Sequence, residues 1–306
     1  MSFKVRILGC GSALPTTYRN ASAQILQYNG HNMLIDCAEG TQILLRKYQV
    51  KFSNLNHIFI SHLHGDHFYG LFGLLSSLSL MGRRGEVYIH CPENLRDMLT
   101  SPNSPLNLDE MDLNLVFVPL SPDGLSLTHS TRRMEVYSFP LKHRIDTWGF
   151  IFKEKERQPN IRKEVIAKYN LSIAEIVKVK DGMDLMLPDG SIVPNSELTI
   201  PPDPPASYAY VSDTLKLDSV VDYVKDCTVL YHEATYENAL AKRAKETFHC
   251  TAGQAAEVAL KANAQKLVLG HFSGRYRTPA LLEQQAREVF PNTVAAKDGL
   301  EIVIVP

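Results

Sequence analysis

One short stretch of the sequence concentrates side chains that bind metals. Residues 61–70 read SHLHGDHFYG and place His62, His64, Asp66 and His67 within six positions. Imidazole and carboxylate groups are the usual protein ligands of zinc. His62 and His64 alternate by two in an expected extended loop, so both can point to one side, whereas the adjacent Asp66 and His67 diverge. This pattern suits two neighbouring metal ions better than one; the alternative is a polar loop with unrelated histidines.

The cluster lies where a strand is expected to end and a helix to begin. A strand end that runs into a loop is a usual place for ligand groups. Three further candidates also follow strand-like apolar runs: His143 after MEVYSFPL, Asp213 after YAYVS and His271 after KLVLG. Each alone is more readily a capping or core residue, but the four positions together favour a shared metal site. Because a carboxylate has two oxygens, Asp213 could bridge two ions.

Three other polar residues follow or interrupt apolar runs near these positions. Asp36 follows NMLI, Glu233 belongs to HEAT and His249 to FHCT. We expect them to orient ligands or to move protons. His232 and His57 are more readily ordinary core or surface histidines, and we assign them no role.

The elements that must position these residues are strands and helices mixed along the chain. Apolar runs predict strands at 3–9, 23–28, 32–36, 57–61, 86–91, 113–120, 134–141, 208–212, 228–233, 266–270 and 300–305. Helical spacing predicts helices at 41–50, 68–81, 217–225, 252–264 and 281–290. Several strands adjoin one another in sequence, which favours an α/β protein whose helices cover mixed sheets over a simple doubly wound sheet.

Composition excludes some classes of protein. The 306 residues are 44% hydrophobic and 21% charged, with a net charge of −1, so any nucleic-acid site must be a local basic patch. The five cysteines form no CxxC pair, which indicates a reducing compartment. The N-terminus does not read as a signal peptide, and no apolar run is long enough to span a bilayer. We therefore expect a cytoplasmic protein that does not enter membranes.

Residues 153–205 interrupt the alternation of predicted strands and helices. Up to Gly182 they hold eight Lys/Arg against five Asp/Glu, and they end in PPDPP, which cannot sit inside a helix or a central strand. PDGSIVP predicts a turn between extended pieces. From composition, a solvated surface insertion is favoured; the alternative is an arm that reaches a partner.

The motifs resemble a known family. HLHGDH at 62–67 matches the HxHxDH signature of the metallo-β-lactamase superfamily. Finer motifs resemble ribonuclease Z, the family of tRNA 3′-processing endonucleases, in this order along the chain: LGCGSALP, DCAEGTQ, SHLHGDHFYGL, PLKHR, SDT, HEATY, FHCTAGQAAEVA and GHFSGRY. The resemblance implies a four-layer αββα sandwich in which 1–306 form one domain. It also implies that 153–205 are an inserted flexible arm that binds tRNA as an exosite.

The resemblance implies a mechanism as well. It implies two Zn²⁺ ions per subunit, one held by His62, His64, His143 and Asp213, the other by Asp66, His67, Asp213 and His271. A hydroxide between them would attack the phosphate, because zinc lowers the pKa of bound water from about 15.7 towards 7. Asp66 would help to position this hydroxide. His249, oriented by Glu233, would protonate the leaving 3′-oxygen.

The implied substrate is precursor tRNA, acted on by a homodimer. Cleavage would leave a 3′-hydroxyl on the tRNA and a 5′-phosphate on the trailer; the sequence does not indicate whether it falls before or after CCA. Scattered basic residues such as Arg19, Arg144 and Arg275 are individually more readily surface charges, so only the arm is expected to contact RNA. Two alternatives stand beside this function: a phosphodiesterase or arylsulfatase-like hydrolase of small molecules, and a non-catalytic RNA-binding protein.

The chain departs from the family pattern at three places. Ala38 stands where the family usually has glycine in DCGEGTQ, and Cys250 stands where it usually has serine in HST. The tip of the arm reads NLSIAEIVKVKDG in place of a glycine-rich, GP-containing tip. The first two positions flank predicted site residues, and the third concerns the reach of the arm towards its substrate.

Overall fold

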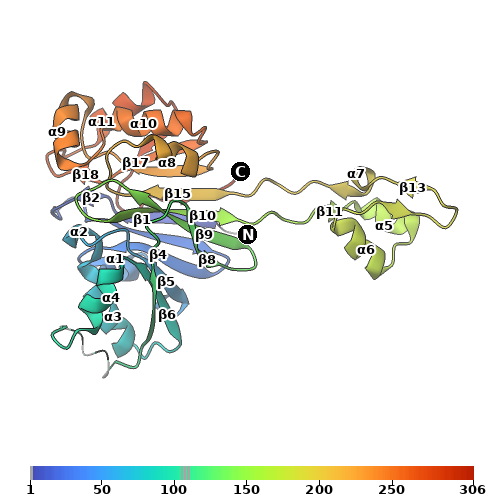
Figure 1. The fold of residues 1–306 in the computed structure, drawn as a ribbon, viewed down its shortest axis with the longest axis horizontal. Helices are drawn as coiled ribbons and strands as arrows, with labels where there is room; N and C mark the ends of the chain where they lie inside the picture. Colours follow the sequence, from blue (N-terminus) through green and yellow to red (C-terminus); the bar gives the residue numbers. More distant parts are fainter. Residues whose placement is uncertain (1–2, 105, 107, 109–110) are drawn as a thin grey trace.

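Two seven-stranded sheets stack face to face, and helices cover their outer faces (Figure 1). The computed structural model describes residues 3–104, 106, 108 and 111–306. The first sheet has the order β20-β1-β3-β4-β5-β6-β7 and the second β19-β17-β16-β15-β10-β9-β8. Both mix antiparallel and parallel pairs, as β3–β4 and β4–β5 show in the first sheet and β10–β15 and β15–β16 in the second. The chain therefore has the four layers that the family resemblance implies.

The strands of the first sheet are β1 (Phe3–Gly9), β3 (Ala23–Tyr28), β4 (His31–Cys37), β5 (Leu55–Phe59), β6 (Glu86–Cys91), β7 (Asn114–Pro119) and β20 (Glu301–Val303). Those of the second are β8 (Ser126–Ser130), β9 (Met134–Leu141), β10 (Thr147–Glu154), β15 (Ser207–Val211), β16 (Val229–Glu233), β17 (Lys266–Gly270) and β19 (Thr293–Ala295). A separate short pair joins β2 (Gly11–Ser12) to β18 (Phe272–Ser273).

Apolar side chains fill the layers on both sides of each sheet. Between the sheets, the ring of Phe59 packs edge-on against Phe150 and Phe152, with centroids 5.4 and 5.1 Å apart. The outer face of the first sheet is covered by α1 (Thr41–Lys47), α3 (Gly70–Leu80) and α4 (Glu93–Thr100), and that of the second by α8 (Asp218–Tyr223), α10 (Ala252–Lys261) and α11 (Ala280–Arg287). The remaining body helices are α2 (Gly65–Phe68) and α9 (Ala241–Thr247). Burial on both faces explains why the central strands read as nearly continuous apolar runs.

Several predicted boundaries were wrong, and some elements were missed. Strand β5 ends at Phe59 rather than at residue 61, so the ligand loop begins two residues earlier than predicted. Strands β8, β10 and β19 and helices α4 and α9 were not predicted from the sequence. Only extended pieces were predicted within 153–205, where the structure has helices as well.

The segment 153–205 leaves the body as a stalk of two extended stretches, one outgoing and one returning, which carries a small folded tip (Figure 1). The tip contains β11 (Asn160–Ile161), α5 (Lys163–Tyr169), α6 (Ile173–Lys180), β12 (Leu185–Met186), β13 (Ile192–Val193), α7 (Asn195–Leu198) and β14 (Thr199–Ile200). It has its own buried cluster, which includes Val165, Val179 and Leu198. Over the whole segment the charges are eight Lys/Arg and nine Asp/Glu, so the positive excess is confined to its first half. We call this segment the arm.

None of the helices in the described part of the chain is long and apolar enough to cross a membrane. All five cysteines are buried and free of disulfides.

Candidate metal centre

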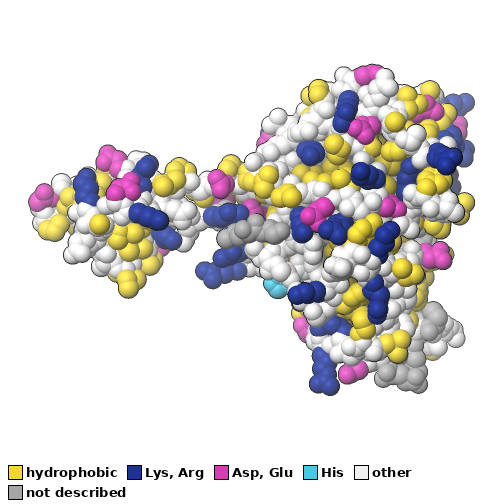
Figure 2. Space-filling model, turned by 180° about the vertical axis from the view of Figure 1, so that it is seen from behind, with side chains coloured by type: hydrophobic (Ala, Val, Ile, Leu, Met, Phe, Trp, Pro, Cys, Tyr) yellow, Lys and Arg dark blue, Asp and Glu magenta, His cyan; other side chains and the backbone are white. Residues whose placement is uncertain are grey.

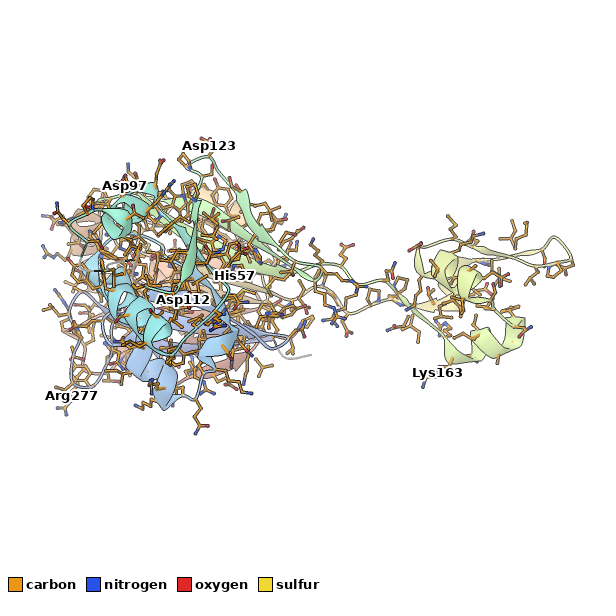
Figure 3. The ribbon with its side chains drawn as sticks, turned by 90° about the horizontal axis from the view of Figure 1, so that it is seen from below. His57, Asp97, Asp112, Asp123, Lys163 and Arg277 are labelled. Atoms are coloured by element: carbon orange, nitrogen blue, oxygen red, sulfur yellow. The ribbon has the colours of Figure 1, made fainter. Side chains whose placement is uncertain are left out.

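The loops that follow β5, β9, β15 and β17 meet at one end of the sandwich. The nearby elements α2, β2 and β18 lie at the end of the body opposite the arm (Figure 1). Figure 3 shows the same separation from below, with Arg277 at one end of the molecule and Lys163 on the arm at the other. These loops bring together the seven residues predicted as metal ligands, in two groups.

The first group contains His62, His64, His143 and Asp213, whose nearest ligand atoms all lie within 4.8 Å of one another. His64 Nδ1 is 3.1 Å from His62 Nε2 and 3.2 Å from His143 Nε2. His62 is fully buried, whereas His64 is partly exposed to a cleft. Three imidazole nitrogens that converge at such short distances form a cradle for a cation, because each can offer a lone pair to the same point.

The second group contains Asp66, His67 and His271. His67 Nε2 and His271 Nε2 are 3.2 Å apart, and Asp66 Oδ2 lies 3.4 Å from His271 Nε2. The short helix α2 aims Asp66 and His67 into the site, and the backbone N–H of Ala13 donates to Asp66 Oδ2 at 2.6 Å. His271 adopts a left-handed φ of 55°, a strained conformation for a non-glycine residue that typically occurs at functional sites.

Asp213 lies between the two groups. Its Oδ2 faces the first group, 3.6 Å from His62 Nε2, and its Oδ1 faces the second, 3.2 Å from His271 Nε2. The side chain is buried, and Oδ1 has no hydrogen-bond partner. A buried carboxylate oxygen without a donor is costly unless a cation compensates it. The two groups and the carboxylate between them therefore fit a metal centre.

Each of four histidines in these groups is held through Nδ1, which leaves Nε2 to face inwards. His67 Nδ1 donates to Asp36 Oδ2 at 2.8 Å, and His143 Nδ1 donates to the carbonyl of Phe248 at 2.9 Å. Ser61 Oγ lies 3.0 Å from the Nδ1 of His62, and Thr235 Oγ1 lies 3.0 Å from that of His271. Such outer contacts set the tautomer and direction of metal-binding imidazoles.

Asp36 is the most connected of these outer residues. Its buried carboxylate also accepts from the backbone N–H of Ser61 at 2.7 Å and from the hydroxyl of Tyr210 at 2.6 Å. Its φ of 55° is left-handed and costs of the order of 1–3 kcal/mol in a non-glycine residue. Burial alone would lower the pKa of His67, but the carboxylates of Asp213, Asp66 and Asp36 raise it to about 10. Asp36 thus favours a ring that keeps its Nδ1 proton.

His249 and Glu233 form a pair beside the two groups. His249 Nδ1 donates to Glu233 Oε1 at 3.2 Å, and Glu233 is fully buried. Burial alone would lower the pKa of His249, but Glu233 raises it to about 9, so the ring is in its charged, doubly protonated form at neutral pH. The residue stands just before α10, whose first turn is capped reciprocally by Thr251 and Gln254. This helix start fixes the chain that carries His249.

Known proteins resemble this chain over its whole length. Ribonuclease Z of Phocaeicola vulgatus is 45% identical over 302 residues, which are 99% of this chain and 97% of that protein. The chain belongs to the ribonuclease Z family.

Solved structures of the ribonuclease Z family and its relatives agree with the fold. Human tRNase Z, short form, aligns with a TM-score of 0.71 and 28% identity, and covers 99% of this chain and 100% of its own. The metallo-β-lactamase fold protein YhfI of Bacillus subtilis aligns with a TM-score of 0.70, 99% of this chain and 100% of its own, at 16% identity, which shows the fold alone. The predicted αββα metallo-β-lactamase fold is therefore confirmed.

A family model described as anti-Pycsar protein Apyc1 matches residues 3–153. This match ends where the arm begins and excludes Asp213 and His271. The ribonuclease Z relative, in contrast, also spans the arm and the second half of the site.

The ribonuclease Z site opens into a cleft of about 880 Å³. Its lining includes His64, Asp66 and His249, together with two arginines, Arg144 and Arg275. Arg144 is exposed, and the guanidinium of Arg275 lies 5.1 Å from the ring centre of Tyr236. A cleft with a metal cradle at its floor and cations on its walls suits a substrate phosphate.

Two expectations about individual residues need correction or extension. Arg19 is not a surface charge: it is 7% exposed and lies over the ring of Phe272. Ser61 and Thr235 lie within the motifs SHLHGDHFYGL and HEATY but were not predicted as site residues. The contacts of Ser61 with Asp36 and of Thr235 with His271 join segments that are far apart in the sequence.

We predict that Asp36→Asn weakens Zn²⁺ binding by the second group by about 10- to 100-fold. The amide keeps the size of the side chain but removes the negative charge that accepts the hydrogen bond from His67 Nδ1, and its nitrogen faces a buried donor, either the Ser61 N–H or the Tyr210 hydroxyl. Titration of the metal-free protein with Zn²⁺ against a competing chelator measures the effect, and Asp146→Asn, at an exposed carboxylate, is the matched control. Equal affinities in both variants would mean that Asp36 only ties strand ends together.

Proposed function

We propose that this chain is a zinc-dependent endoribonuclease that removes the 3′ trailer from precursor tRNA. The products would be a tRNA with a 3′-hydroxyl and a trailer with a 5′-phosphate. The observation that carries the proposal is the placement of Asp213, with one oxygen towards each of two histidine groups. The full-length similarity to ribonuclease Z supports tRNA as the substrate class.

The donor set suits two Zn²⁺ ions. The first would be held by His62, His64, His143 and Asp213, and the second by Asp66, His67, Asp213 and His271. When bound, such ions activate a water molecule and neutralise charge on the phosphate. Asp66 projects into the cleft and is anchored by the Ala13 N–H, which leaves its other oxygen to orient the attacking water.

His249 supplies the proton for the leaving group. Its Nδ1 is occupied by Glu233, so the Nε2 side of the ring is left to serve the cleft that the residue lines. A 3′-alkoxide is a poor leaving group, and a positioned acid lowers the barrier to its departure. The Glu233 carboxylate is itself held in place, because it also accepts hydrogen bonds from the backbone N–H groups of Thr235 at 2.9 Å and Cys250 at 2.7 Å.

The arm would hold the body of the tRNA. Within one subunit it leaves the body at the end opposite α2, β2 and β18, which contribute residues to the cleft (Figure 1), and this supports a homodimer in which each arm serves the partner's cleft. Dark-blue side chains gather where the arm joins the body (Figure 2). Recognition of the RNA by backbone and shape rather than by sequence suits such a surface.

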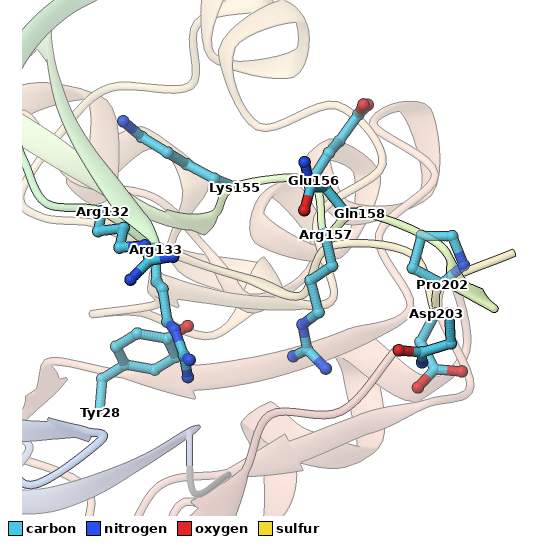
Figure 4. A pocket seen from close by; sticks show the side chains of 10 residues that line it. Tyr28, Arg132, Arg133, Lys155, Glu156, Arg157, Gln158, Pro202 and Asp203 are labelled. Carbon is cyan, nitrogen blue, oxygen red and sulfur yellow. The ribbon is translucent and has the colours of Figure 1, made fainter. Parts of the chain in front are cut away.

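A pocket at the root of the arm adds to this surface. It has a volume of about 530 Å³ and is lined by Arg132, Arg133, Lys155 and Arg157 together with two acidic residues (Figure 4). Arg157 is paired with Glu154 at 2.8 Å and Lys155 with Glu135 at 3.3 Å, so part of this charge is balanced within the protein. The gathering of basic side chains nevertheless supports contacts with phosphates near the root of the arm.

Cleavage of a 3′-labelled precursor tRNA tests the proposed function. We expect the metal-loaded protein to cut near the acceptor end and Asp66→Ala to leave the RNA intact. Mapping the trailer to the nucleotide also reports whether the cut precedes or follows CCA. If the metal-loaded protein does not cut, a panel of cyclic nucleotides, phosphodiesters and sulfate esters tests the small-molecule alternative. Tight tRNA binding without any cleavage would instead favour a non-catalytic RNA-binding protein.

A further inference from the structure

A second group of histidines lies between the two sheets. One ring nitrogen of each of His57, His90 and His129 lies within 4.8 Å of the others. His57 and His90 come from the neighbouring strands β5 and β6 of the first sheet, and His129 comes from β8 of the second. His57 precedes the metal ligand His62 by roughly 15 Å of extended chain. The group is therefore distinct from the centre described above.

The spacing of these rings resembles that of the metal centre. His57 Nδ1 lies 3.2 Å from His90 Nε2, as close as His64 Nδ1 lies to His143 Nε2. Nitrogens that each lie about 2.0–2.1 Å from a tetrahedral zinc are about 3.3 Å apart. Two of the three rings thus already have the separation that a shared zinc ion requires.

His90 is oriented as metal-binding histidines usually are. Its Nδ1 lies 3.1 Å from Thr128 Oγ1, which leaves Nε2 to face His57. Strand β8 has an irregular register between Leu127 and His129, so Thr128 is an extra residue relative to β9. Such bulges redirect side chains, and they recur beside functional sites. This one brings both Thr128 and His129 to the histidine group.

His129 is the part of the group that hydrogen bonding leaves unexplained. A proton shared between His57 and His90 would satisfy those two rings. The Nε2 of His129 is buried and has no partner, whereas a cation at the centre of the group would give it one. Burial lowers the pKa of His57 to about 3 and that of His90 to about 2, so both rings keep their lone pairs at neutral pH.

We propose that His57, His90 and His129 bind a zinc ion that joins the two sheets near the root of the arm. Neutral imidazoles are ligands that zinc accepts readily, and three of them leave the fourth position for a water molecule. A pocket of about 300 Å³ that His57 and His129 line gives that water access. Figure 3 places His57 in the body on the side from which the arm leaves. The bound ion fixes β5 and β6 against β8.

Metal counting tests the proposal directly. The protein is stripped with a chelator, reloaded with Zn²⁺, freed of excess metal and measured by inductively coupled plasma mass spectrometry. We expect His129→Gln to hold one zinc ion fewer per subunit than the unaltered protein. His31→Gln is the matched control, because exposed His31 lines the same pocket outside the three-histidine group, and it should keep the full count. Equal counts in His129→Gln and the unaltered protein, or equal losses in both variants, would overturn the proposal.

A measurement on the unaltered protein guards against a variant that does not fold. Crystals of the zinc-loaded protein are measured at the zinc absorption edge. We expect an anomalous peak about 2.0–2.1 Å from a ring nitrogen of each of the three histidines. Peaks at the Asp213 centre with none between β5, β6 and β8 would overturn it. Neither readout depends on cleavage of RNA, so the outcome is separate from that of the proposed function.

Discussion

Replacing His249 with alanine is expected to slow cleavage of precursor tRNA by about 10²- to 10⁴-fold, the usual contribution of a general acid. The physical reason is that the 3′-oxygen must then leave as an alkoxide. The zinc content should stay at its original value, because His249 belongs to neither of the proposed four-ligand sets. Single-turnover cleavage of labelled RNA measures the rate, and mass spectrometry of the metal measures the content.

A substrate with a good leaving group separates the loss of an acid from damage to the site. Bis-p-nitrophenyl phosphate releases a phenolate that needs no protonation, so its hydrolysis should change little in His249→Ala. A normal rate on tRNA, or an equal loss on both substrates, would remove His249 as the acid. Glu233→Gln is less suitable as a probe. Its amide nitrogen would face the donors of Thr235 or Cys250, and each buried unsatisfied group costs about 1–3 kcal/mol.

The seven residues that meet in the two groups could be singled out from the sequence because each lies in a motif near a strand end. Apart from Asp36, the contacts that orient their side chains could not. Thr235 contacts His271 only because separate loops meet, and Phe248 contributes to His143 a backbone carbonyl that has no sequence signature. Ser61 contacts the adjacent His62, and its hydroxyl also donates to Asp36 at the end of another strand. The left-handed φ of Asp36 could not be predicted either, because nothing in NMLID distinguishes Asp36 from an ordinary strand residue.

The missed strands have different causes. The residues of β10, TWGFIFKE, are almost all buried and form an apolar run that is typical of a strand. Strand β8, SLTHS, is a polar edge strand with a bulge, and neither alternation nor apolar content marks it. His129 therefore could not be associated with His57 from the sequence. The arm helices were not predicted because their many charged residues obscure the few apolar positions that form the small core of the tip.

The departures from the family pattern have a physical explanation in the structure. Cys250 contributes its backbone N–H to Glu233, and its Sγ lies 3.2 Å from the carbonyl of Thr214, so a thiol can stand where a hydroxyl is usual. Ala38 is buried and has no positive φ, so that position does not require glycine. Position 70 does require glycine, because a Cβ added to Gly70 would lie 1.8 Å from the carbonyl oxygen of Ala38.

Removing the arm is expected to lower kcat/KM on precursor tRNA by about 10²- to 10⁴-fold, because a second contact surface on one substrate adds that much to affinity. Strands β10 and β15 allow a clean excision. They pair antiparallel with Lys153 opposite Ser207, and Glu154 N–H donates to the carbonyl of Ala206 at 2.9 Å. Replacing 155–205 by Asn-Gly closes this pair with a favoured two-residue hairpin turn.

The armless protein should hydrolyse bis-p-nitrophenyl phosphate at the original rate, because α2, β2 and β18, which contribute residues to the cleft, lie at the other end of the body (Figure 1). Equal loss on both substrates would mean that the arm supports the fold instead of the RNA. Mixed dimers then test the proposed homodimer and show which cleft an arm serves. A subunit without the arm, combined with an Asp66→Ala subunit that keeps it, should recover tRNA cleavage, because the arm of the inactive subunit reaches the intact cleft. If the mixture stays inactive, each arm acts with its own cleft, and the arm's position in the structure requires a tRNA that spans the whole body.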